Sequence, residues 1–142
     1  LFLIILPVLY IQKESYSYLN LRDLVGVIIW GIGFFFEVVG DRQLRAFVRD
    51  AQNQGKILTT GLWRYTRHPN YFGEVTVWWG IWIIAGSVTG SFWTIIGPLT
   101  ITYLILKVSG IPMLEKKYEG NQEFEEYKKR TNKFFPWFSG AN

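Results

Sequence analysis

Apolar and charged residues occupy separate stretches of this 142-residue chain. Three apolar blocks run over about 21–39, 71–85 and 92–108, and the charged residues gather between and after them. Water-soluble helices carry both kinds of residue on opposite faces, whereas a helix in a lipid bilayer is apolar all round. Charged residues make up 18% of the chain, below the roughly 25% of soluble domains. The sequence therefore predicts an all-α fold, a polytopic transmembrane helical bundle.

The ends of the chain differ from these blocks. Residues 1–11 are apolar but fall short of the roughly 20 residues that a spanning helix needs, so we interpret them as a partial span. Residues 1–142 then form a single membrane domain, the C-terminal part of a longer protein. The tail, 109–142, includes a predicted amphipathic helix over 113–130, with Gly120-Asn121 as a possible break within it.

The basic residues indicate the topology. Lys and Arg are concentrated in 41–67 and in the tail. Cytoplasmic loops of membrane proteins carry an excess of Lys and Arg, so both segments are expected on the cytoplasmic side. The loops at 12–20 and 86–91 then face outward. This arrangement would place a polar cofactor pocket at the cytoplasmic half of the bundle.

Two kinds of metal site are disfavoured by composition. The chain contains no Cys, which excludes disulfides and thiolate ligands, and its single histidine, His68, makes a histidine-based site improbable. No metal is expected.

The segment Arg67-His68-Pro69-Asn70-Tyr71 is polar and directly precedes an apolar block. Pro69 suits the first turn of a helix, where a missing N–H costs nothing. A helix N-terminus with arginines nearby is a natural site for phosphate or carboxylate groups. Asn70 and Glu74 are four residues apart and share a helix face. The alternative is a capped helix end whose arginines touch lipid headgroups.

Glu37 lies near the cytoplasmic end of the first apolar block. An ionisable group at that depth is costly in lipid, so it should face the bundle interior or a polar cavity. Asp41 and Arg45 continue its helix face at a spacing of four. This face and the one of Asn70 and Glu74 are expected to meet across one pocket. A salt bridge between Arg45 and either acid is the alternative, and both arrangements are compatible.

His68 has three possible roles: proton donor, cofactor ligand or hydrogen-bonding group at the helix start. Its unperturbed pKa lies near 6.5, and neighbouring arginines favour the neutral form. It also precedes the second apolar block on the cytoplasmic side, away from a substrate in the membrane. We therefore predict that His68 positions a cofactor.

The segment 61–74, preceded by 40–47, resembles the DUF1295 family of bacterial membrane proteins, which belongs with the steroid 5-alpha-reductase and sterol reductase group. The tail, from 109–116 to 134–137, is similar to the C-terminus of that family. The wider superfamily contains two chemistries. One branch reduces double bonds with NADPH, and the other, which includes isoprenylcysteine carboxyl methyltransferases, uses S-adenosylmethionine.

The resemblance implies an NADPH-dependent reductase of a carbon–carbon double bond in a hydrophobic, steroid-like or isoprenoid, enone, located in the bacterial inner membrane. The alternative is an S-adenosylmethionine-dependent methyltransferase of a lipid-like or prenylated acceptor. Expected partners are a hydrophobic small molecule and membrane lipids, with no nucleic acid. Positions that match the family imply a cofactor site formed by Glu37, Asp41, Arg45, Arg67, His68, Asn70, Tyr71 and Glu74. The residues that activate the substrate are expected in earlier helices, so no catalytic residue is assigned.

Overall fold

The computed structural model describes residues 1–13, 19–86 and 91–138, and within these ranges the chain is helical with no β-strand. The predicted all-α class is confirmed. The α-helices are α1 (Phe2–Lys13), α2 (Leu21–Arg49), α3 (Pro69–Ala85), α4 (Ile96–Tyr103), α5 (Ile111–Lys116) and α6 (Gln122–Arg130). Short 3-10 helices span Ala51–Asn53, Gly61–Arg64 and Ser91–Ile95, and a π-helix spans Leu104–Val108.

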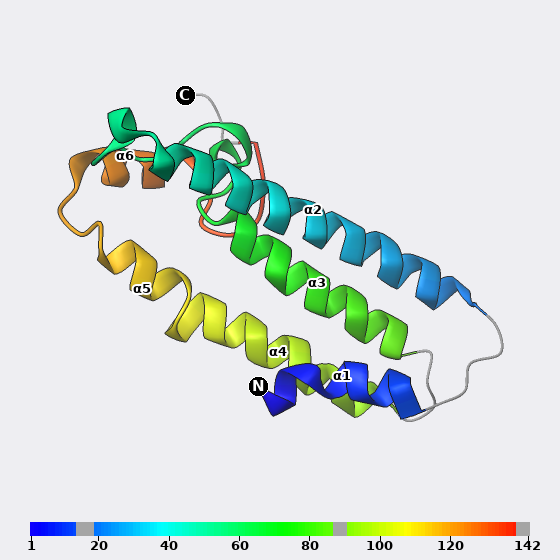
Figure 1. Ribbon diagram of the computed structural model, residues 1–142. Coiled ribbons are helices and arrows are strands. Elements are labelled where there is room, and N and C mark those ends of the chain that lie inside the picture. The colour runs from blue at the N-terminus through cyan, green and yellow to red at the C-terminus, as the bar shows by residue number, and fades with distance from the viewer. Residues whose placement is uncertain (14–18, 87–90, 139–142) are drawn as a thin grey trace.

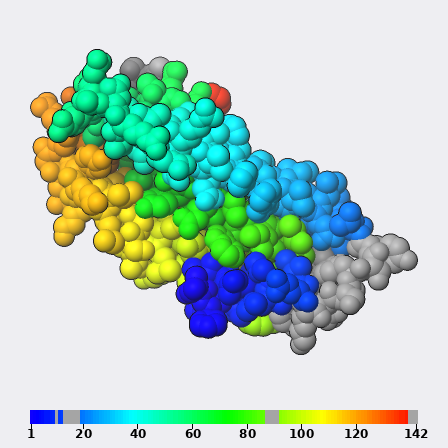
Figure 2. All heavy atoms as spheres, in the orientation of Figure 1, coloured from blue at the N-terminus to red at the C-terminus, as the bar shows by residue number. Residues whose placement is uncertain are grey.

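The helix α3 lies between α2 on one side and the α4–α5 stretch on the other (Figure 1). Its main partner is α2, and α1 packs on α3 and α4. The end of α2, the start of α3 and the tail helix α6 gather at one end of the molecule, and α1 lies at the other (Figures 1 and 2). The two loops that were predicted to face outward fall largely on 14–18 and 87–90, outside the described residues.

Glycines at intervals of seven let α2 and α3 approach until their backbones touch. A Cβ added at Gly80 would lie 2.6 Å from the backbone nitrogen of Trp30, and one at Gly33 would lie 2.8 Å from the carbonyl oxygen of Gly73. Real side chains cannot occupy such positions, so only glycine permits this spacing. The full set of contact glycines is Gly26, Gly33 and Gly40 on α2 with Gly73 and Gly80 on α3.

The helix α2 extends ten residues beyond the end predicted for the first apolar block. The sequence interpretation ended the apolar block at Val39 and placed Asp41 and Arg45 on the same helix face as Glu37, and the helix continues to Arg49. Gly40 lies within the helix, and the missing side chain there makes room for the backbone of Asn70. The helix ends before Asp50, whose side chain accepts a hydrogen bond from the backbone of Gln52 and starts the next turn. Asp41 and the arginines of 41–49 therefore lie on the helix α2.

The other boundaries agree more closely with the sequence. The helix α3 begins at Pro69, as predicted. The tail is not one helix over 113–130 but two, α5 and α6, and Gly120 lies between them with φ +81°. That left-handed backbone favours glycine, so the possible break at Gly120-Asn121 is real. Asn121 caps α6 by accepting from the backbone N–H of Phe124.

Among the described residues, two stretches are long and apolar enough to cross a membrane, Leu21–Arg49 and Phe92–Lys116. Many of the apolar side chains of α2 are exposed in the described structure, among them Val27, Ile28, Phe34 and Phe35. An exposed apolar helix face of this length is typical of contact with lipid or with further helices.

Candidate functional site

The segment that precedes α3 is anchored on α2 by hydrogen bonds. The side chain of Gln43 accepts from the backbone N–H of Leu62 at 3.0 Å. The indole N–H of Trp63 donates to the carbonyl oxygen of Gly40 at 3.2 Å, and both groups are buried. These contacts fix the start of α3 against the polar end of α2, although His68 at the N-cap makes no side-chain capping bond.

A group of hydrogen-bond acceptors forms where α2 and α3 meet, and we call Glu37, Asp41, Asn70 and Glu74 the acceptor cluster. The side-chain amide nitrogen of Asn70 donates to Asp41 Oδ1 at 3.0 Å. Gly73 brings α3 against the backbone of Glu37. The carboxylates of Glu37 and Asp41 are near enough to act electrostatically on Glu74. The two predicted helix faces therefore meet in direct contact at Asn70 and Asp41, and the expected pocket between them stays a prediction.

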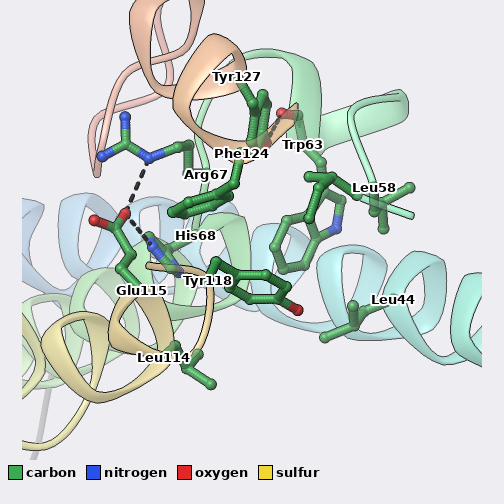
Figure 3. Close-up of a pocket in the computed structure, with 11 residues that line it drawn as sticks. Leu44, Leu58, Trp63, Arg67, His68, Leu114, Glu115, Tyr118, Phe124 and Tyr127 are labelled. Carbon is green, nitrogen blue, oxygen red and sulfur yellow. Dashed lines mark hydrogen bonds and ion pairs between the residues drawn. The ribbon is translucent and has the colours of Figure 1, made fainter. Parts of the chain in front are cut away.

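A second group connects the start of α3 to the tail, and Figure 3 shows its three side chains. One oxygen of Glu115 accepts from Arg67 Nε at 2.9 Å and lies 2.9 Å from His68 Nε2. A terminal nitrogen of Arg67 donates to the carbonyl oxygen of Thr131 at 2.7 Å. Only 8% of Arg67 and 5% of His68 are exposed, so these contacts are internal to the protein.

The environment of His68 favours the neutral imidazole. Burial lowers the pKa of His68 from its ordinary value of 6.5, and the positive charges of Arg67 and Lys133 act in the same direction. The bond to Glu115 opposes this shift but does not reverse it. The ring also stacks on Tyr71, with centroids 5.8 Å apart and an interplanar angle of 24°. Its second nitrogen, Nδ1, is buried and has no hydrogen-bond partner among the described residues.

A cavity of about 110 Å³ borders this group. Arg67, His68 and Glu115 line one part of it, and aromatic and aliphatic side chains surround the rest (Figure 3). Those other residues are Leu44, Ile57, Leu58, Trp63, Leu114, Tyr118, Phe124 and Tyr127. The hydroxyl of Tyr127 donates to the carbonyl oxygen of Trp63, and burial raises the pKa of Tyr127 well above its usual value, which keeps that donor protonated.

The predicted site residues thus fall into two adjoining groups. Tyr71 adjoins the acceptor cluster, since Asp41 and Glu74 act on it electrostatically, and its ring contact with His68 links the two groups. Arg45 is exposed and donates from Nε to the carbonyl oxygen of Asp41, 3.4 Å away. The alternative salt bridge from Arg45 to Glu37 or Asp41 is absent within the described ranges.

Sequence reasoning missed Glu115, which lies within the predicted amphipathic helix of the tail. Its side chain is instead 17% exposed and pairs with both Arg67 and His68. No local pattern marked it, because it is one of many charged residues in the tail. The glycines that bring α2 and α3 together recur every seven residues, and the sequence analysis did not use this spacing.

The aromatic residues of the tail differ in burial. Phe134 is buried, with its ring 5.7 Å from that of Phe72 on α3, and the backbone of Trp137 bonds to Tyr65 at 3.2 Å. The side chains of Phe135 and Trp137 are exposed. The tail therefore closes over the segment that precedes α3 while it presents aromatic rings outward.

Several curated proteins whose names refer to 5-alpha-steroid reduction or dehydrogenation are similar in sequence to this chain. The chain is 35% identical over 69 residues to the Bos taurus protein "3-oxo-5-alpha-steroid 4-dehydrogenase 1", which covers 49% of the chain and 27% of the relative. The Rattus norvegicus protein of the same name is 24% identical over 116 residues, which covers 80% of the chain and 41% of the relative. "Steroid 5-alpha-reductase DET2" of Gossypium hirsutum is 32% identical over 69 residues, 49% of the chain and 27% of the relative.

The chain thus spans between about a quarter and two-fifths of the length of these curated relatives. No solved structure matches it significantly. A family model described as "Protein of unknown function (DUF1295)" matches residues 1–131, nearly the whole chain. The chain therefore belongs to the DUF1295 family and is similar to the steroid 5-alpha-reductases.

Proposed function

We propose that this chain is the cofactor-binding part of a membrane-bound, NADPH-dependent reductase that acts on a carbon–carbon double bond in a hydrophobic enone. The names of its relatives support a reductase with a steroid-like substrate. The structural observation that supports it most is the acceptor cluster between α2 and α3, next to the buried Arg67–Glu115–His68 group.

The acceptor cluster fits the nicotinamide riboside half of NADPH. That half offers O–H groups on the ribose and an N–H₂ group on the carboxamide, and each needs an acceptor. Carboxylates supply acceptors only, and the side-chain oxygen of Asn70 is buried without a partner among the described residues. The bond from Asn70 to Asp41 fixes which end of the amide is the acceptor. Asn70 and Glu74 would hold the carboxamide or ribose on this basis.

Arginines on α2 would hold the phosphates. Arg42, Arg45 and Arg49 are exposed on the extension of α2 beyond the apolar block. A planar guanidinium binds phosphate oxygens through two parallel bonds. Arg67 already donates to Glu115 and Thr131, so its contribution would be to hold the floor of the site while Arg45 and its neighbours contact phosphate.

NADPH supplies a hydride when it is bound, and the protein supplies binding and orientation. In this chain Asp41 would orient Asn70, Tyr71 would pack on His68, and the tail would exclude water from the start of α3. The group that protonates the product would come from elsewhere in the whole protein, as the relatives are longer than this chain.

The membrane arrangement belongs to the same proposal. The chain would pass the bacterial inner membrane several times, with 41–67 and the tail in the cytoplasm and 86–91 outside. The concentration of Lys and Arg in those two segments supports it. Substrate would then enter from the bilayer, and cofactor from the cytoplasm.

One observation favours a methyltransferase as the second candidate. Three carboxylates, Glu37, Asp41 and Glu74, lie together, and S-adenosylmethionine carries a positive sulfonium and an ammonium group. Negative charge of this kind suits a cationic ligand better than the phosphates of NADPH. The exposed arginines and the names of the relatives favour the reductase.

Isotope transfer separates the two reactions. The full-length protein in detergent, supplied with NADPH deuterated at C4 of the nicotinamide and a steroidal or isoprenoid enone, should form a saturated ketone heavier by one deuterium. A methylated product formed from labelled S-adenosylmethionine, with no deuterium transfer to any enone, would contradict the reductase and support the second candidate.

A further inference from the structure

We propose that Glu115 is a positioning residue that holds His68 in the tautomer protonated at Nε2, so that Nδ1 remains a hydrogen-bond acceptor for a donor group of the bound ligand. The tautomer follows from contacts within the protein and holds for any ligand. The identity of the ligand donor, a ribose hydroxyl or carboxamide N–H of NADPH, rests on the proposed function.

The contact between Glu115 and His68 determines where the ring proton lies. Glu115 Oε1 lies 2.9 Å from His68 Nε2 and accepts from Arg67 Nε at the same distance. A carboxylate only accepts hydrogen bonds, so the facing ring nitrogen must donate. In a neutral imidazole the other nitrogen then bears a lone pair. The second contact of Glu115, to Arg67, keeps the carboxylate ionised and in place.

The charges around the ring favour a single proton on it. Arg67 and Glu115 balance each other, and a neutral His68 leaves that balance unchanged. A second ring proton would add a positive charge in a buried site that Arg67 and Lys133 already influence. Stacking on Tyr71 limits rotation of the ring, so Nδ1 and Nε2 do not readily exchange positions.

The free lone pair on Nδ1 is the group that remains for a ligand. Nδ1 is buried and lacks a partner within the described part of the chain, and His68 borders the cavity beside Glu115. A buried acceptor without a donor is costly, and a ligand that brings an O–H or N–H removes that cost. An Nδ1 that carries no proton cannot donate one, so His68 orients the ligand and does not act as the acid.

Nitrogen NMR of the histidine ring tests the tautomer directly. The full-length protein would be labelled with ¹⁵N-histidine, and His68→Gln would identify the two His68 signals by their loss. At pH 7.5 the Nε2 signal should be that of a protonated ring nitrogen, and the Nδ1 signal should be that of a nitrogen with a lone pair. A proton on Nδ1, or a doubly protonated ring, would overturn the assignment without bearing on cofactor choice.

A matched pair of variants tests the role of Glu115. Glu115→Gln removes the charge but keeps the size, and it should mix the two tautomers and weaken NADPH binding by about tenfold. Glu125→Gln alters a carboxylate of α6 that pairs with Lys128 on the surface and should change neither. Added NADPH should shift the Nδ1 signal of the unaltered protein. Unchanged ring signals of His68 in Glu115→Gln would contradict the positioning role. If the unaltered protein keeps the Nε2–H tautomer but does not bind NADPH, only the proposed function is contradicted.

Discussion

Asn70 and Asp41 are joined across the contact between α2 and α3 by a hydrogen bond of 3.0 Å from amide nitrogen to carboxylate oxygen. The bond lies where Gly40 allows α3 to start against α2. It turns the other end of the amide, Oδ1, into a buried acceptor with no partner among the described residues. One contact thus connects the packing of the two helices to the proposed recognition of a cofactor.

Removal of the Asn70 side chain should weaken cofactor binding more than it weakens the fold. Asn70→Ala is expected to cost about 1–3 kcal/mol of NADPH binding, the range for a hydrogen bond whose partner is left buried. Calorimetry of the full-length protein measures this loss. Asn53→Ala is the control, because Asn53 also donates its amide to a carbonyl oxygen, that of Phe47 at 3.1 Å, which is not part of the acceptor cluster. Equal losses in both variants would remove Asn70 from the site.

The glycine contact between α2 and α3 should be sensitive to one methyl group. A Cβ at Gly73 would overlap the backbone of Glu37, so Gly73→Ala should force the helices apart and destabilise the protein by about 1–3 kcal/mol. Gly31→Ala on α2 meets nothing within 4 Å and should be neutral or stabilising, because alanine favours helix. Thermal unfolding in detergent compares the two, and equal midpoints would contradict the close approach.

Acid should destabilise the protein through His68. The pKa of His68 is lowered in the folded state, chiefly by burial, so the unfolded chain binds the proton more readily. Stability due to this group is therefore complete above the unfolded pKa of about 6.5 and declines as the pH falls below it, by at most about 1.4 kcal/mol per pH unit. The free energy of unfolding, measured from pH 7.5 to 5.5, should decline less steeply in His68→Gln than in the unaltered protein. Parallel curves would mean that His68 takes up its proton normally.

Cysteine labelling tests the proposed topology. This chain has no cysteine of its own, so single cysteines at Leu19 and Lys56, both exposed, can be labelled selectively once any others in the full-length protein are replaced. An impermeant thiol reagent added to intact cells should modify position 19 but leave position 56 unmodified until the membrane is opened. Labelling of both positions from outside would contradict the cytoplasmic location of 41–67.

Local patterns in the sequence were enough for the all-α class and for the start of α3. Pro69 marked the start of α3, and a charge within an apolar block marked Glu37 as a residue that faces protein. The extent of α2 beyond Arg45 was left open, although no helix-breaking residue lies between Gly40 and Gly55. Polarity indicates where a helix leaves the membrane, not where it ends.

Contacts between distant segments could not be predicted in this way. Glu115 is 47 residues from His68, and nothing in the local pattern of the tail shows that α5 returns to the start of α3. The same holds for Arg67, whose guanidinium bonds to Glu115 and Thr131, both distant from it in the sequence. Pairings of this kind depend on how the tail folds back over the bundle.

Cofactor choice is the central claim, and a single binding measurement addresses it. The full-length protein in detergent would be titrated with NADPH and, separately, with S-adenosylmethionine in a calorimeter. We predict saturable binding of NADPH that Asn70→Ala weakens and Asn53→Ala leaves intact, and no saturable binding of S-adenosylmethionine. Saturable binding of S-adenosylmethionine with none of NADPH would contradict the reductase.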